Sequence, residues 1–124
     1  MIKGIGTDLC EVRRMAQLLT DSSFLMRYFD EAEQQHIQSR GALAADSMAG
    51  IFAAKEALVK ALGTGFDGIG LKDIVVVHDA FGAPSYQLLG PALERARAMK
   101  VTRMHLSISH DGGMALAFAV LEGE

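Results

Sequence analysis

The sequence is poor in cysteine, with Cys10 as its single thiol. One cysteine cannot form a disulfide within the chain, which is typical of proteins from a reducing compartment, and no cluster of cysteine and histidine residues indicates a zinc site. We therefore expect Cys10 to be a small buried residue.

Long apolar segments and an excess of basic residues are also missing. Half of the residues are hydrophobic, yet no run approaches the roughly 18 to 20 apolar residues of a membrane span, and the N-terminal MIKGIG lacks the apolar region of a signal peptide. This predicts a cytoplasmic protein. The net charge of −3 argues against a general nucleic-acid binder, because such proteins usually carry a basic excess. Any anionic partner must therefore meet a local basic patch.

The longest helical pattern covers residues 46–65. Asp46 or Ser47 is placed to cap its N-terminus, and Gly63 is placed to end it in the left-handed conformation. One apolar stripe is made by Met48, Ile51, Phe52, Leu58, Val59 and Leu62. Lys55 falls near the middle of this stripe, where a core helix does not normally carry an ammonium group. Two interpretations stay open: Lys55 lays its stem on apolar surface and sends its ammonium to water, or it is held for an anion.

The N-terminal residues 2–8 predict a short strand that ends at Asp8. Gly4 and Gly6 are poor strand formers, so they indicate a bend or a close approach of the backbone to another element. The following segment, EVRRMAQLL, predicts a helix with a buried stripe, which leaves Arg13 and Arg14 facing out as an adjacent pair of cations. The members of the stripe are Val12, Met15, Ala16 and Leu19.

Two further helices are expected before the longest one. The aromatic-rich residues 23–29 predict a short helix packed on the core. Asp30 and Glu33 form the pattern of a capping box, which begins a helix that ends near Arg40. His36 lies on the mostly polar surface of that helix and is interpreted as structural.

Gly63, Gly65 and Gly68 match the dinucleotide-binding fingerprint letter for letter. That fingerprint needs a strand before the glycines and a helix after them. Here a helix precedes and a strand follows, which argues against a Rossmann fold.

The C-terminal half predicts two hairpins. Strands at residues 73–78 and 85–89 are joined by a loop containing Gly82 and Pro84, and Pro91 begins a helix that runs to about residue 100. In RMHLSIS the residues alternate between two faces, and after a turn at 111–113 the apolar strand MALAFAVLE follows, with His110 at the tip of the hairpin. Because the helices cluster early and the hairpins late, and no repeat or linker divides the chain, we expect a single α+β domain over residues 1–124.

Three segments occur in order over nearly the whole chain: GIGTDLCEVRR at 4–14, FAAKEALVKALGTGF at 52–66 and LSISHDGGMALA at 106–117. Together with Gly82 and Pro84, they resemble the holo-(acyl-carrier-protein) synthase family of the 4′-phosphopantetheinyl transferase superfamily. The resemblance implies an antiparallel sheet with one long central helix, and a homotrimer with sites at its subunit interfaces. It also implies a Mg²⁺-dependent transfer of the phosphopantetheine arm from coenzyme A to a serine of an acyl carrier protein, with release of 3′,5′-ADP.

The resemblance also implies roles for single residues. Asp8 and Glu56 would hold Mg²⁺, with Glu56 helping to deprotonate the serine, and Lys60 would stabilise the leaving phosphate. The residues implied to bind coenzyme A are Lys55, Lys60, Gly63, Gly65, Pro84, Ser107, Ser109 and His110. Arg13 and Arg14 would meet the acidic helix of the carrier protein, and so supply the local basic patch.

The chain departs from the family pattern at two positions. Ile51 stands where an arginine often helps to hold the 3′-phosphate of the nucleotide, and Ala83 stands where a basic residue is common. Arg40 is a candidate replacement for the missing cation.

Two other functions stay open. A non-catalytic module of the same fold would bind coenzyme A or a carrier protein without transfer, but the joint presence of Asp8, Glu56 and Lys60 speaks against it, since a binder needs no metal site. A Mg²⁺-dependent nucleotide hydrolase is disfavoured because the sequence lacks a P-loop. The sequence also leaves open whether the carrier is of the fatty-acid or the polyketide type.

Overall fold

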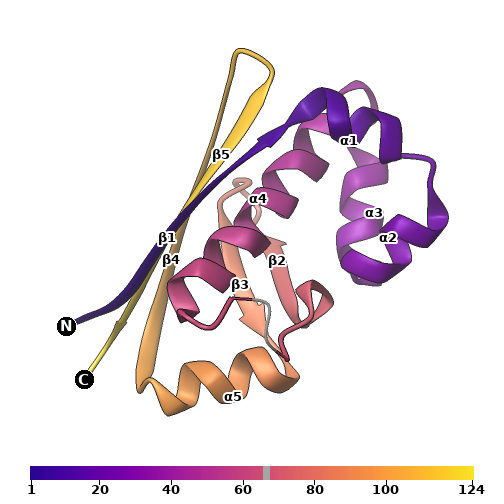
Figure 1. Cartoon of the computed structure of the whole chain (residues 1–124). Coiled ribbons are helices and arrows are strands. Elements are labelled where there is room, and N and C mark those ends of the chain that lie inside the picture. The colour runs from indigo at the N-terminus through magenta and orange to yellow at the C-terminus, as the bar shows by residue number, and fades with distance from the viewer. Residues whose placement is uncertain (66–67) are drawn as a thin grey trace.

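A three-stranded antiparallel sheet and one long helix form the centre of the molecule (Figure 1). The computed structural model describes residues 1–65 and 68–124. The strands are β1 (Ile2–Glu11), β4 (Val101–Asp111) and β5 (Met114–Gly123), in the order β1-β5-β4, and the helix is α4 (Ala44–Leu62). The predicted α+β domain with an antiparallel sheet and a long central helix is confirmed.

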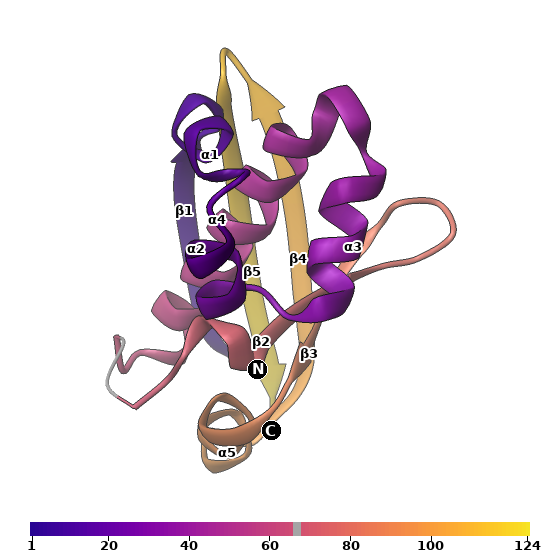
Figure 2. The same cartoon turned by 90° about the vertical axis from the view of Figure 1, so that its right-hand side faces the viewer.

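Shorter elements surround α4. They are α1 (Val12–Leu18), α2 (Ser22–Tyr28), α3 (Glu31–Ser39), α5 (Gly90–Ala98), the hairpin of β2 (Ile74–His78) and β3 (Pro84–Leu88), and two 3-10 turns at Gly41–Leu43 and Leu71–Asp73. Figure 2 shows α1 and α2 on one side of α4, and α3 with the β2–β3 hairpin on the other. Within the described residues, no helix has the length and apolar character that a membrane span requires.

The strand β1 lies directly on the backbone of α4. A Cβ atom added at Gly4 would collide with the carbonyl oxygen of Ala61, and one added at Gly6 would collide with that of Ala57. Two glycines therefore let strand and helix touch without side chains between them. Of the two alternatives for Gly4 and Gly6, a bend or a close approach, the close approach is confirmed.

The ends of α4 agree only in part with the sequence pattern. Gly63 takes φ 75° just after the helix and its N–H donates to the carbonyl of Lys60, which confirms the predicted C-terminal stop. The predicted N-terminal cap at Asp46 or Ser47 is wrong. The 3-10 turn at Gly41–Leu43 leads the chain straight into the helix, which begins at Ala44 without a side-chain cap.

Two smaller predictions, one for Asp30 with Glu33 and one for Cys10, are confirmed. The capping box of Asp30 and Glu33 is present at the start of α3. Cys10 is buried, and burial raises the pKa of its thiol to about 11. Ala16 is exposed although it was expected to be buried. Leu18 is half-buried instead, because the buried face of α1 is centred on Met15 and turned toward Leu18.

One face of the sheet is not covered by any element of the described residues. All the helices lie on the side of α4, as Figure 1 shows. On the opposite side, Ile5 and Leu9 of β1 are each 62% exposed, and Leu116 and Phe118 of β5 are 41% and 43% exposed. We call this surface the open sheet face. It presents large apolar side chains to the solvent in a single chain.

Candidate active site

Asp8 and Lys60 meet where β1 crosses α4. Asp8 alternates with Thr7 and Leu9 along the strand, so its side chain points toward the helix. The ammonium of Lys60 donates to Oδ1 of Asp8 at 3.0 Å and to the carbonyl of Thr7 at 2.9 Å. The other oxygen, Oδ2 of Asp8, is buried and has no hydrogen-bond partner among the residues that the structure describes. A buried carboxylate oxygen of this kind is suited to receive a cation.

Glu56 lies one turn before Lys60 on α4 and interacts with the same carboxylate. Burial raises the pKa of Glu56 to about 7, with a further contribution from the neighbouring Asp8, while the positive charges of Arg14 and Lys60 oppose the shift. Two carboxyl groups in contact cannot both be ionised cheaply. A proton or a bound cation relieves their repulsion.

The donor set of this acid pair fits Mg²⁺. This ion is usually bound by one or two carboxylates and keeps several of its waters, so two acids are sufficient. Across the described parts of the chain, no group of three or more histidine, cysteine or acidic side chains is arranged to hold a metal. The unpartnered Oδ2 of Asp8 and the adjacent Glu56 are thus the residues that would hold such an ion.

A wide cavity opens beside Glu56. Its volume is about 480 Å³, and its lining consists of Arg14, Phe24, Arg27, Tyr28, Phe52, Glu56, Ile69, Gly70 and Leu71. We call it the aromatic groove. The guanidinium of Arg14 lies 5.5 Å from the ring centroid of Phe52, and that of Arg27 lies 5.3 Å from that of Tyr28. The groove therefore combines an apolar floor with two cations and leads to the acid pair.

A second cavity, of about 230 Å³, lies on the other side of α4. Its lining consists of His36, Arg40, Ser47, Gly50, His78, Gly82, Pro84, Ile108 and His110. We call it the histidine cavity. His110 is fixed there by a 2.8 Å hydrogen bond between its Nε2 and the carbonyl of Asp46 on α4. The cavity thus brings together Pro84 and His110, two of the residues predicted to bind coenzyme A, with Arg40.

Other predicted coenzyme A residues lie apart from this cavity. Ser107 and Ser109 point to the open sheet face, where they pair in register with Phe118 and Leu116, whereas His110 points toward α4. Strand alternation separates them within one chain, although the sequence places them in one motif. Gly63 ends α4 and Gly65 follows it, one turn beyond Lys60.

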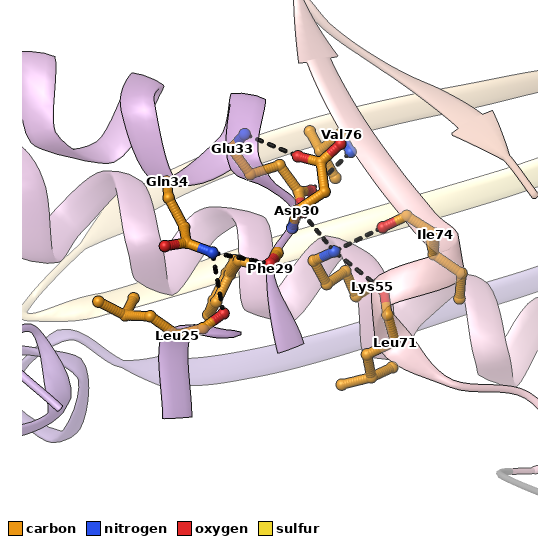
Figure 3. A network of polar contacts seen from close by, with 9 residues as sticks. All are labelled: Leu25, Phe29, Asp30, Glu33, Gln34, Lys55, Leu71, Ile74 and Val76. Carbon is orange, nitrogen blue, oxygen red and sulfur yellow. Dashed lines mark hydrogen bonds and ion pairs between the residues drawn. The ribbon is translucent and has the colours of Figure 1, made fainter. Parts of the chain in front are cut away.

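Lys55 is bound to an anion that the sequence did not identify. It is fully buried, and its ammonium donates to Oε1 of Glu33 at 2.7 Å and to the carbonyls of Leu71 at 2.9 Å and Ile74 at 2.6 Å (Figure 3). An ammonium has three protons, so this arrangement leaves none for coenzyme A. A head in water does not explain its place on the apolar stripe. The ammonium is held for an anion, and in this structure that anion is Glu33.

Glu33 serves two purposes at once. Its Oε1 accepts the backbone N–H of Asp30 within the capping box, and its Oε2 accepts the backbone N–H of Val76 on β2 at 2.8 Å. Burial raises the pKa of Glu33, and the charge of Lys55 opposes that shift. The lysine on the apolar stripe was the available sequence signal, since a buried ammonium requires a carboxylate partner.

His36 and His78 form a contact that the sequence did not reveal. Their imidazole rings stack with centroids 4.0 Å apart and planes inclined by 8°. His36, which the sequence pattern indicates to be structural, contributes to the lining of the histidine cavity. Ile51, in contrast, is buried in the core and is not part of this lining.

Comparisons with known proteins identify first the superfamily of this chain and then the family within it. A family model described as the 4′-phosphopantetheinyl transferase superfamily matches residues 4–119. The chain is 43% identical over 125 residues to a protein of Clostridium tetani named holo-[acyl-carrier-protein] synthase, covering 100% of this chain and 98% of that protein.

Two solved structures show the same fold. The crystal structure of a holo-[acyl-carrier-protein] synthase from Neisseria meningitidis superposes with a TM-score of 0.85 at 36% identity, covering 98% of this chain and 99% of that one. A synthase from Bacillus anthracis, in complex with CoA (3′,5′-ADP), gives 0.81 at 35% identity and covers 100% and 99% of the two chains. The chain therefore belongs to the 4′-phosphopantetheinyl transferase superfamily, and within it to the holo-[acyl-carrier-protein] synthases.

Proposed function

We propose that this chain transfers the 4′-phosphopantetheine arm of coenzyme A to a serine of an apo acyl carrier protein and releases 3′,5′-ADP. The observation that carries the proposal is the acid pair of Asp8 and Glu56, with Lys60 bound to the carboxylate of Asp8. Transfer from a pyrophosphate requires neutralisation of its charge and a positioned nucleophile. The acid pair and the lysine provide groups for both tasks.

The serine oxygen forms a bond to the β-phosphorus of coenzyme A, and the bond from that phosphorus to the oxygen of 3′,5′-ADP breaks. Glu56 is the group that takes up the serine proton, directly or through a water, because it lies beside Asp8 and lines the groove through which the serine would reach the acid pair. Lys60 supplies a positive charge to the phosphate oxygens.

Asp8 and Glu56 would together hold Mg²⁺. A bound Mg²⁺ supplies charge neutralisation at the pyrophosphate. The buried, unpartnered Oδ2 of Asp8, within the described residues, supports this assignment.

The aromatic groove is the proposed docking surface for the carrier protein. It leads to Glu56, so a helix that presents its serine there would bring the hydroxyl to the acid pair. Arg14 and Arg27 line the groove, and Arg13 is exposed on the neighbouring α1. These cations would meet the acidic helix implied for the partner, while the aromatic floor would take its apolar residues.

We also propose that the chain works as a homotrimer with shared sites. Asp8 lies on β1 and His110 on β4, the opposite edge strands of the sheet. A coenzyme that needs both the acid pair and the histidine cavity is accommodated if one copy supplies the first and a neighbouring copy the second. The open sheet face supports assembly, because large exposed apolar patches mark interaction sites.

The test is to incubate the protein with coenzyme A, Mg²⁺ and apo carrier protein, and to weigh the carrier by mass spectrometry. The proposal predicts a mass gain of one phosphopantetheine group with release of 3′,5′-ADP. A Lys60→Gln variant should be slow, whereas the matched variant at the exposed Lys72, Lys72→Gln, should keep wild-type activity. An unmodified carrier would favour the non-catalytic module, and 3′,5′-ADP released without carrier would favour a hydrolase.

A further inference from the structure

The histidine cavity is unusually rich in groups that can carry positive charge. Three of the four histidines of the chain, His36, His78 and His110, line it together with Arg40. None of the described residues that line it is acidic. The cavity therefore has one permanent cation and a set of imidazoles whose charge depends on pH.

The stack of His36 and His78 favours neutral rings in the empty cavity. Two imidazolium ions 4.0 Å apart would repel each other. Burial lowers the pKa of both histidines, the charge of Arg40 lowers both further, and His36 lowers that of His78. Asp79, which follows β2, acts in the opposite direction on His78. His110, on β4, lines the same cavity and is hydrogen-bonded to the carbonyl of Asp46.

A bound anion would favour a protonated ring in the stack over two neutral rings. A phosphate group placed beside Arg40 neutralises its charge and adds negative charge close to the stack. An opposite charge within about 4–6 Å favours the ionised form of a histidine. One ring of the stack would then take up a proton, and the resulting imidazolium would hold the phosphate.

We propose that His36 and His78 are specificity-determining residues that bind a phosphate-bearing part of coenzyme A in the histidine cavity with uptake of a proton. The proposal rests on the proposed function, because it takes this cavity as part of the coenzyme site. Arg40 supplies the permanent positive charge of the lining, and an imidazole adds a second positive charge only when the ligand is present. The pair thereby links nucleotide affinity to pH and favours ligands that carry a phosphate there.

The direction of the pH effect follows from linkage. The pKa of the pair is low without the ligand and higher with it, so binding takes up a proton between those two values. Affinity therefore rises as the pH falls through this range, by at most about tenfold per pH unit for one proton. A phosphate monoester itself gains a proton near pH 6, which lowers the population of its dianion at low pH. The pH dependence of binding must therefore be compared with that of a variant that lacks the two histidines.

The experiment is isothermal titration calorimetry with 3′,5′-ADP at several pH values between about 5.5 and 8.5, in pairs of buffers that differ in ionisation enthalpy. The wild type should take up as much as about one proton more than the double variant His36→Gln/His78→Gln. Glu31→Gln is the control, since Glu31 is exposed on the same helix as His36 and lies outside the cavity lining, and it should behave as the wild type. Arg40→Gln should bind more weakly at every pH and still take up a proton. Equal proton uptake by the wild type and the double variant would overturn the proposal.

Two further measurements keep the test decisive. Adenosine, which has no phosphate, should bind without proton uptake. NMR titration of the imidazole ring protons in the wild type, with and without 3′,5′-ADP, should show a rise in the pKa of His36 or His78 and needs no variant to fold. The same preparation should also be tested for modification of the carrier protein, which separates the two hypotheses. Transfer to the carrier with no proton uptake on 3′,5′-ADP binding would refute only this inference. Proton uptake on binding with no transfer would refute only the proposed function.

Discussion

The carboxylate of Glu33 lies 2.7 Å from the ammonium of Lys55, 22 residues later in the chain, and neither side chain reaches the surface. The pair joins α3 to α4, and its remaining hydrogen bonds reach Asp30, Leu71, Ile74 and Val76. Burying two charges is costly unless each is fully satisfied, as both are here. The pair acts as an internal tie between three segments.

We predict that Glu33→Gln and Lys55→Met will each lower the free energy of unfolding by about 3–5 kcal/mol, because each leaves an uncompensated buried charge. The double variant should lose less than the sum of the two. Urea denaturation measures this, with the exposed Glu31→Gln on the same helix as the control. The KM for coenzyme A of the folded Glu33→Gln fraction should stay unchanged. A stable Lys55→Met protein with a raised KM for coenzyme A would restore the ligand-binding role of Lys55.

The acid pair should respond unequally to substitution. Asp8→Asn should weaken Mg²⁺ binding and recover in part at high Mg²⁺, because an amide oxygen is a poorer ligand for a hard cation. Glu56→Gln should lose about a hundredfold or more in kcat that added metal does not restore, because it also loses the proton acceptor. Titration of Mg²⁺ against kcat compares the two, after circular dichroism confirms that each is folded. Complete rescue of both would show that Glu56 is only a ligand.

Glu56 should also make the stability of the metal-free protein depend on pH. Its folded pKa of about 7 lies above the ordinary value of 4.5, so the folded state holds a proton that the unfolded state has already lost. The free energy of unfolding should therefore fall as pH rises from about 4.5 to about 7. Glu56→Gln should remove this part of the dependence, and Glu94→Gln on the surface should not. Urea titrations with a chelator present measure it, and an unchanged profile in Glu56→Gln would refute the assignment.

Charge reversal beside the aromatic groove should affect the carrier protein selectively. Replacing Arg13 and Arg14 by glutamate should raise the KM for the carrier much more than it lowers kcat, as expected when uniform binding is lost. Added salt should weaken the wild-type interaction as well. Arg97→Glu on α5 is the matched exposed control. Steady-state kinetics with varied carrier decides the matter, and an unchanged KM in the doubly reversed variant would place the docking surface elsewhere.

Shared sites make a prediction about mixtures. Asp8→Asn and His110→Ala should each be poorly active, and subunit exchange between them should restore activity, because some interfaces then combine an intact acid pair with an intact histidine cavity. Phe118→Glu on the open sheet face should prevent assembly, which sedimentation would show. If the mixture gains no activity after demonstrated exchange, each site lies within one chain.

Local patterns predicted most of the fold. The capping box at Asp30 and Glu33, the stop at Gly63 and the alternation along β4 depend on neighbouring residues, and each is present in the structure. The cap at Asp46 or Ser47 failed because a 3-10 turn, which has a weak sequence signature, begins the helix two residues earlier than Asp46.

The site was less accessible from the sequence. Asp8 and Glu56 were paired by family resemblance, since their contact depends on how β1 packs on α4 and not on spacing. Lys55 was visible as an anomaly, but its partner Glu33 lies on another helix and had already been assigned to a cap. The stack of His36 and His78 joins the end of a helix to the end of a strand, and no local pattern describes such a contact.

The bare contact of β1 with α4 has a consequence for how this chain tolerates substitution. Gly4 and Gly6 have no side chain that could take part in the reaction, yet a methyl group at either position would push the strand from the helix and separate Asp8 from Glu56. The spacing of the two backbones that carry the acids is therefore set by this direct contact of strand and helix. We expect replacement of either glycine to lower activity in a mutational scan as much as replacement of a catalytic residue does. The cause would be displacement of β1 from α4 and not the loss of a reacting group.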